Sequence, residues 1–154
     1  MDIKKLYQNF SGYMDNCKGK KCSVSCCKVA SKKGIDIYPD EVIYYVNKYG
    51  KDFPGRIIYT KKSVTSFQMF DCLGNDCLLK ENKAIICRGF PIKPFSLVKG
   101  INRILTSESC PGHKELNKKF VQESYELWGE VYKDRFRTSF WKVWKARYLL
   151  RKLK

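Results

Sequence analysis

The sequence predicts an α+β protein, a small single domain with cysteine-rich loops, short strands and a long basic C-terminal helical extension. Three observations lead to this prediction. Segments with helical apolar spacing alternate with short runs of β-branched and aromatic residues, eight cysteines are grouped between these segments, and basic residues accumulate near the C-terminus. A chain of 154 residues fits one domain and can bury a hydrophobic core.

The first half of the chain predicts two helices and three short strands. Residues 2–10 carry apolar side chains at helical spacing. A second helix is expected to begin at Pro39, which suits a first helical position, and to stop at Gly50. Apolar and polar residues alternate within 34–38, which predicts a short strand there. Runs rich in β-branched and aromatic residues predict two further strands, at 56–60 and 64–70.

The second half predicts a hairpin followed by a long helical region. Strands are expected at 95–98 and 101–106, joined at Lys99-Gly100 by a turn that needs a glycine at positive φ. From His113 to the C-terminus the spacing is helical, with candidate breaks at Gly129 and at the Thr138-Ser139 pair. One stripe of this region comprises Leu116, Phe120, Ser124, Leu127 and Val131.

The charge of the chain divides it into two expected parts. Residues 1–112 are expected to form the cysteine-cluster domain, and residues 113–154 a basic amphipathic helical extension that packs on it or projects from it. The net charge is +16, and residues 133–154 contribute +8 of it, from nine basic residues and one acid. Such a field favours an anionic partner, namely an acidic protein, nucleic acid or a membrane surface.

Two interpretations of the basic tail stay open. In the first, its aromatic stripe is exposed, and Trp141 and Trp144 serve as anchors in an anionic membrane surface or as stacking platforms for nucleic acid. In the second, the stripe packs on the domain and the cations form its solvated outer face. The residues near one helical face are Phe136, Phe140, Val143, Trp144, Arg147 and Leu150.

The expected compartment decides how the cysteines are interpreted. No apolar run approaches the ~20 residues that a transmembrane helix needs, and the first residues lack the apolar core of a signal peptide. We therefore expect a cytoplasmic protein, whose thiols are kept reduced. Clustered cysteines in that compartment favour metal binding, although an even number of eight also permits disulfides in a secreted chain.

The cysteines form two groups and one late member. Thiolate sulfur suits zinc and iron–sulfur clusters, whereas carboxylate oxygen suits calcium and magnesium. The spacings match neither a zinc ribbon nor a C2H2 finger, and clusters accept irregular spacings, so we place an iron–sulfur cluster of the 4Fe-4S type first and zinc second. The expected outcome is a metal-stabilised domain. Its candidate metal ligands are Cys17, Cys22, Cys26, Cys27, Cys72, Cys77, Cys87 and Cys110.

Cations flank these cysteines. Neighbouring positive charge lowers the pKa of a thiol and stabilises the thiolate that binds metal. His113, three residues after Cys110, is a further candidate ligand, although a place in the solvated first turn of the last helix is the simpler interpretation. The flanking cations are Lys18, Lys20, Lys21, Lys28 and Arg88.

The cysteine motifs resemble those of a known family. The run from Cys17 to Cys27, the stretch DCLGNDCLLKENKAIICRGFP at 71–91 and SCPGH at 109–113 are together similar to the YkgJ-type cysteine-cluster family. The resemblance covers about residues 6–113 and implies a zinc- or iron-chelating domain. The chain departs from the family pattern at Lys83-Ala84, where an Arg-Pro pair is usual. Its first two cysteines, Cys17 and Cys22, are separated by four residues, which is a looser spacing than in the family's tightest form.

This family is in turn similar to a domain of the flagellin lysine N-methylases, which are thought to use S-adenosylmethionine together with an iron–sulfur cluster. The chain contains no glycine-rich βαβ fingerprint for a nucleotide cofactor. We therefore expect a metal-binding accessory or redox module. The alternative is a cluster-dependent, S-adenosylmethionine-using enzyme that methylates protein lysine or a small molecule, and no catalytic residue can be assigned to it.

Overall fold

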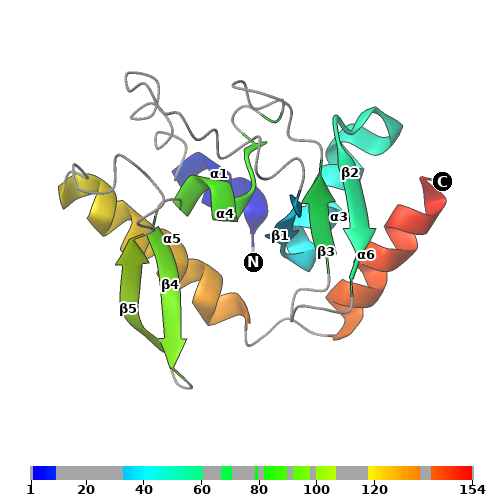
Figure 1. Ribbon diagram of the computed structural model, residues 1–154. Helices are drawn as coiled ribbons and strands as arrows, with labels where there is room; N and C mark the ends of the chain where they lie inside the picture. The colour runs from blue at the N-terminus through cyan, green and yellow to red at the C-terminus, as the bar shows by residue number, and fades with distance from the viewer. Residues whose placement is uncertain are drawn as a thin grey trace. The chain divides into compact units, whose positions relative to one another are not determined.

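The computed structural model describes residues 2–9, 33–60, 67–70, 79, 82–89, 92–97, 100–106, 118–135 and 140–153. Helices and short antiparallel strands follow one another within them, which confirms the mixed helix and strand content of the predicted α+β class (Figure 1). The described elements fall into two compact units. Unit 1 contains residues 3–9, 85–89, 92–97, 100–106 and 118–135, and unit 2 contains residues 33–60, 67–70, 79, 82–84 and 140–153.

Unit 2 is built on a three-stranded antiparallel sheet. Its strands are β1 (Ile35–Ile37), β2 (Arg56–Tyr59) and β3 (Phe67–Phe70), in the order β1-β3-β2. Ile37 and Tyr59 both pair with Phe67 across the sheet, and Phe67, Met69 and Ile37 are buried. Burial alternates along β3, which therefore turns Phe67 and Met69 toward the core.

Helix α3 (Pro39–Tyr49) confirms the predicted start and stop. Pro39 occupies the first helical position, and the Glu41 carboxylate accepts a hydrogen bond of 3.0 Å from the backbone N–H of Tyr38, so the helix start is satisfied by its own side chain. Gly50 has a φ of 55°, which suits glycine, and begins the short 3-10 helix η2 (Gly50–Asp52). Val42, Tyr45 and Val46 of α3 are buried.

Helix α6 (Phe140–Lys152) packs against α3 in unit 2. The ammonium group of Lys142 lies 3.0 Å from the Asp40 carboxylate in the first turn of α3. Ala146 is the buried residue of α6, and its small side chain permits a close approach to α3. On β2, Tyr59 lies under the guanidinium of Arg147, which is 4.2 Å from the ring centroid.

Unit 1 joins a hairpin to three helices. The hairpin pairs β4 (Ile92–Leu97) with β5 (Gly100–Thr106), and the helices are α1 (Ile3–Asn9), α4 (Ile85–Gly89) and α5 (Lys118–Arg135). β4 begins at Ile92 rather than at Phe95 as predicted, and it includes Pro94. A proline is tolerated there because β5 is the one strand that pairs with β4 among the described residues, so β4 keeps an edge.

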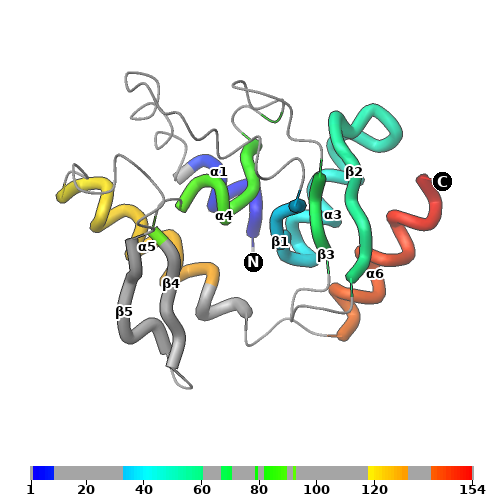
Figure 2. The backbone as a smooth tube through the Cα atoms, in the orientation of Figure 1, coloured from blue at the N-terminus to red at the C-terminus, as the bar shows by residue number. Residues whose placement is uncertain are grey.

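Helix α5 confirms the predicted stripe and corrects one predicted break. Phe120, Ser124, Leu127 and Val131 are all buried, while Leu116 lies outside the described residues. The backbone continues as a helix through Gly129, so the break expected there is wrong (Figure 2). A glycine costs a helix only about 1 kcal/mol relative to alanine, and the buried residues on either side of Gly129 offset this.

The predicted helical region from His113 onwards is described in two parts. α5 ends at Arg135 and belongs to unit 1, whereas α6 begins at Phe140 and belongs to unit 2. The candidate break at Thr138-Ser139 and the segment 113–117 lie outside the described residues. The division into a domain at 1–112 and an extension at 113–154 stays a prediction.

Candidate functional site

Cys87 is the candidate metal ligand that the structure describes. It lies on α4 and is half-buried. The other seven candidates lie outside the described residues, namely Cys17, Cys22, Cys26, Cys27, Cys72, Cys77 and Cys110. The same holds for His113 and for the flanking Lys18, Lys20, Lys21 and Lys28. Within the described ranges no three His, Cys, Asp or Glu side chains come together to hold a metal ion. The grouping of the eight cysteines therefore stays a prediction.

The backbone that leads to Cys87 is held in unit 2 by the main chain of Asn82. The Asn82 N–H donates a hydrogen bond of 2.7 Å to the carbonyl oxygen of Leu79. The Asn82 carbonyl oxygen accepts a hydrogen bond of 2.9 Å from the Tyr45 hydroxyl on α3. Both Asn82 and Tyr45 are buried, so these main-chain groups are satisfied away from water.

The side chain of Asn82 makes two further bonds to α3. Its Oδ1 accepts a hydrogen bond of 2.6 Å from the Tyr44 hydroxyl, and its Nδ2 donates one of 3.1 Å to the Tyr49 hydroxyl. Three tyrosines of one helix thus converge on a single asparagine five residues before Cys87. The sequence analysis missed this cluster. Its available signal was the run of tyrosines at 44, 45 and 49, because tyrosine hydroxyls need partners when they are buried.

Arg88 connects α4 to α1 within unit 1. Its guanidinium lies 4.2 Å from the centroid of the Tyr7 ring, and Nη1 donates a long hydrogen bond of 3.4 Å to the Tyr7 carbonyl oxygen. Arg88 is buried. The sequence interpretation gave Arg88 the role of a charge beside the cysteines. The side chain is bound to α1, and Tyr7 precedes the first cysteine, Cys17, by ten residues.

Gly89 ends α4 and lies close to Trp128 of α5. A Cβ placed on Gly89 would lie 2.6 Å from the indole ring of Trp128, so no larger residue fits without movement of the ring. The same indole donates a hydrogen bond of 3.1 Å from Nε1 to the carbonyl oxygen of Ile92 at the start of β4. Trp128 is buried and therefore fixes both ends of the Gly89–Ile92 segment.

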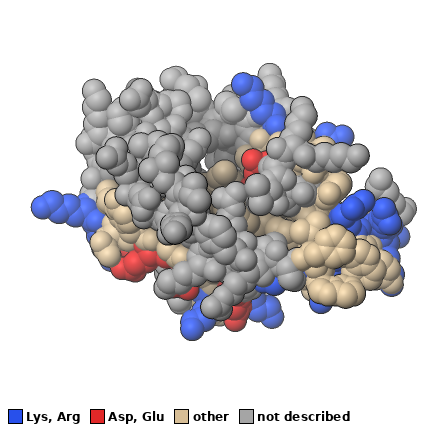
Figure 3. Space-filling model, turned by 90° about the horizontal axis from the view of Figure 1, so that it is seen from below, with Lys and Arg blue, Asp and Glu red and all other residues tan. Residues whose placement is uncertain are grey.

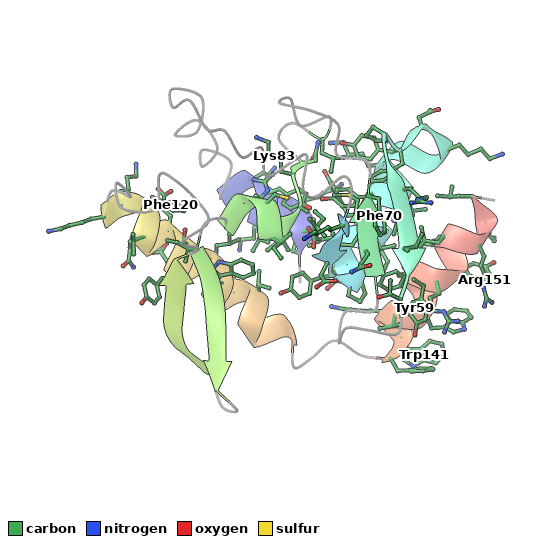
Figure 4. All side chains as sticks on the ribbon, in the orientation of Figure 1. Tyr59, Phe70, Lys83, Phe120, Trp141 and Arg151 are labelled. Carbon is green, nitrogen blue, oxygen red and sulfur yellow. The ribbon has the colours of Figure 1, made fainter. Side chains whose placement is uncertain are left out.

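The structure describes Lys83 and Ala84, the positions at which the sequence resemblance leads us to expect an Arg-Pro pair. Ala84 is completely buried. Lys83, which is labelled in Figure 4, is half-buried. The buried alanine is small and apolar, as a proline at this position would be, and the chain has no arginine at either position.

A second candidate site is the outer face of α6. Phe140, Trp141, Trp144 and Tyr148 have exposed fractions of 80%, 70%, 49% and 43%. The interpretation that the aromatic stripe packs on the domain is therefore wrong for Phe140 and Trp144. Their neighbours on the predicted stripe are turned inward, since Val143, Arg147 and Leu150 are half-buried, and Phe136 lies outside the described residues.

Comparisons of the chain with protein-family models, with curated proteins and with solved structures found no match. Among the described residues, no helix is long and apolar enough to cross a membrane. The functional argument therefore depends on the residues of this chain, namely the cysteine pattern, the fixed segment around Cys87 and the exposed face of α6.

Proposed function

We propose that the chain binds a metal through its clustered cysteines, as an iron–sulfur cluster in the first place and as zinc in the second, and that it acts as an accessory or redox module. The proposal starts from eight thiols in 154 residues, seven of them in two groups. Soft sulfur donors in such groups suit these two metals. The ligand pool is Cys17, Cys22, Cys26, Cys27, Cys72, Cys77, Cys87 and Cys110.

The observation that carries the proposal is the fixation of the segment around Cys87. After Cys87, Arg88 is bound to Tyr7, and Gly89 contacts Trp128. These contacts hold the end of α4 within unit 1, so Cys87, which is half-buried there, would lose little conformational freedom on binding a metal, as a ligand residue should.

The metal would determine what the chain does with this site. A bound iron–sulfur cluster would supply one-electron transfer, and zinc would supply a structural clamp with an apparent binding free energy of about 10–16 kcal/mol, as in zinc-finger peptides. The chain's own contribution is the set of thiolates and the nearby positive charge of Lys18, Lys20, Lys21 and Lys28, which favours the deprotonated thiols.

The test is metal and acid-labile sulfide analysis, with a visible absorption spectrum, on full-length protein purified without oxygen. Iron and sulfide in comparable, stoichiometric amounts in a brown protein would support the cluster. Stoichiometric zinc in a colourless protein would support the clamp. Protein that is folded by circular dichroism and carries no stoichiometric metal would overturn the proposal.

Cys87→Ser and Ile86→Ser form a matched pair for the described ligand. Both positions are half-buried on α4, so the two substitutions disturb the same helix to a similar extent. Cys87→Ser is expected to lower the bound metal or to change its spectrum, whereas Ile86→Ser keeps every thiol and should keep the metal. Equal loss in both variants would remove Cys87 from the ligand set.

A further inference from the structure

The outer face of α6 exposes its largest side chains. Trp141, Trp144 and Tyr148 recur at spacings of three and four residues, which places them in one row along the helix. Ala146 is buried on the opposite side, against α3. A helix stabilised only by its own domain would turn its aromatic residues inward, so this row is available to a partner.

The rings of this row contact one another. Trp141 and Trp144 meet edge to face, with centroids 5.8 Å apart and planes at 82°. Trp144 and Tyr148 are stacked, with centroids 5.5 Å apart and planes at 7°. The ammonium group of Lys152 lies 4.7 Å from the centroid of the Tyr148 ring. The row, hereafter the α6 aromatic row (Trp141, Trp144 and Tyr148), is thus a continuous apolar ridge that ends at a cation.

Positive charge borders the ridge on both sides. α6 contains five basic residues and no acid. Lys145 and Lys152 follow one edge of the α6 aromatic row and Arg151 the other, and all three are exposed. Seen from below, uncharged surface lies next to Lys and Arg side chains in the region of α6 (Figure 3). Trp141 and Arg151 both point outward from the helix (Figure 4).

An anionic lipid surface matches this face better than nucleic acid does. Bases stack on free ring faces, but Trp144 and Tyr148 stack on each other and Lys152 lies over Tyr148. Tryptophan and tyrosine are instead enriched at the headgroup level of membranes, where an apolar ring body and a polar N–H or O–H are both accommodated. Lys and Arg side chains beside such rings add electrostatic attraction to an anionic leaflet.

We propose that α6 docks flat on an anionic lipid bilayer, with the α6 aromatic row at headgroup level and Lys145, Arg151 and Lys152 against the lipid phosphates and carboxylates. This mode of binding lies in the interface and needs no membrane-spanning segment. The inward side of α6 stays on α3, so docking requires no rearrangement of unit 2. The proposal is independent of which metal the cysteines bind.

The test is cosedimentation of the full chain with two kinds of vesicle, one of phosphatidylcholine alone and one of equal parts phosphatidylserine and phosphatidylcholine. Binding is expected to the second kind and to weaken as salt is raised, because salt screens the cations. Trp141→Ala/Trp144→Ala is expected to weaken binding by about tenfold or more. Lys145→Gln/Lys152→Gln should weaken it and flatten its salt dependence.

Matched controls lie on α5. Tyr125 is an exposed aromatic residue there, and Lys118 and Lys119 are exposed cations, so Tyr125→Ala and Lys118→Gln/Lys119→Gln remove the same chemistry from a different surface. Both controls should bind vesicles as the unaltered chain does. Circular dichroism shows whether each variant is folded, and these exposed substitutions should leave the thermal unfolding of the chain nearly unchanged.

Three results would overturn the proposal. The first is no preference of the unaltered chain for anionic vesicles. The second is unchanged vesicle binding by Trp141→Ala/Trp144→Ala. The third is binding to polyuridylate RNA in place of vesicles, lost in the same variant, which would assign the α6 aromatic row to nucleic acid.

Discussion

The guanidinium of Arg88 lies 4.2 Å from the centroid of the Tyr7 ring and donates a hydrogen bond to the Tyr7 carbonyl oxygen. Eighty-one residues separate the two partners in the chain. The contact ties the helix that precedes the first cysteine group to the helix that carries Cys87, within unit 1. It is therefore a structural link, and its strength can be measured.

Arg88→Ala is expected to lower the free energy of unfolding by about 2–3 kcal/mol, because it removes a desolvated cation–π contact and a hydrogen bond to a charged group. Urea denaturation followed by circular dichroism measures the change. Arg56→Ala is the matched control, since Arg56 lies over the Phe70 ring at 5.1 Å but is exposed. It should cost no more than about 1 kcal/mol, and equal effects would contradict the structural role of Arg88.

Asn82→Ala is expected to cost about 2 kcal/mol, because the side-chain bonds to Tyr44 and Tyr49 are lost together. Tyr44→Phe removes one of these bonds and should cost about 1 kcal/mol. In a double-mutant cycle, the combined variant should cost less than the sum, since both changes remove the same bond. Asn47→Ala, at an exposed position of α3, is the control and should not lower the free energy of unfolding, because alanine has the higher helix propensity.

Gly89→Ala and Gly129→Ala should have opposite signs. At Gly89 the added methyl group would meet the Trp128 ring at 2.6 Å, so we expect a loss of about 1–3 kcal/mol from overpacking. At Gly129 the methyl group would meet nothing within 4 Å, so the higher helix propensity of alanine should add about 0.5–1 kcal/mol. Thermal unfolding followed by circular dichroism compares the two, and a stabilised Gly89→Ala would show that α4 and α5 do not pack this closely.

The Lys142–Asp40 ion pair should contribute measurably to the packing of α6 on α3. Its two side chains are 29% and 13% exposed and 3.0 Å apart, so we expect a coupling of about 1 kcal/mol in a double-mutant cycle with Lys142→Met and Asp40→Asn. The Lys119–Glu123 pair on α5, at 3.9 Å and 86% and 42% exposed, is the control. Its coupling should be lost at high salt, while that of Lys142 and Asp40 should persist.

Local signals predicted most of the described secondary structure. Pro39 and Gly50 bound α3, and the stripe from Phe120 to Val131 is buried on α5. These features depend on residues close in sequence, where spacing and capping chemistry are informative. The predicted break at Gly129 failed because packing on both sides of a glycine outweighs its low helix propensity.

Long-range contacts could not be predicted in this way. The short helix α4 was missed, and the partners that hold its neighbourhood are distant, since Asn82 bonds Tyr44 across 38 residues and Arg88 bonds Tyr7 across 81. The orientation of α6 was also open, because aromatic residues or the smaller Val143 and Ala146 could equally have faced the domain. The cysteine pattern remains a sequence argument, with Cys87 placed by the structure on α4.

The three tryptophans report on different parts of the molecule. Trp128 is buried in unit 1 with its indole N–H bonded to Ile92, whereas Trp141 and Trp144 are exposed in unit 2. Indole emission moves to longer wavelength when water relaxes around the excited ring, so the fluorescence spectrum should contain a blue component from Trp128 and a red component from α6. Opening of unit 1 alone would convert the blue component to red and leave the rest unchanged. The chain thus carries an intrinsic optical probe that distinguishes the unfolding of unit 1 from that of the whole molecule.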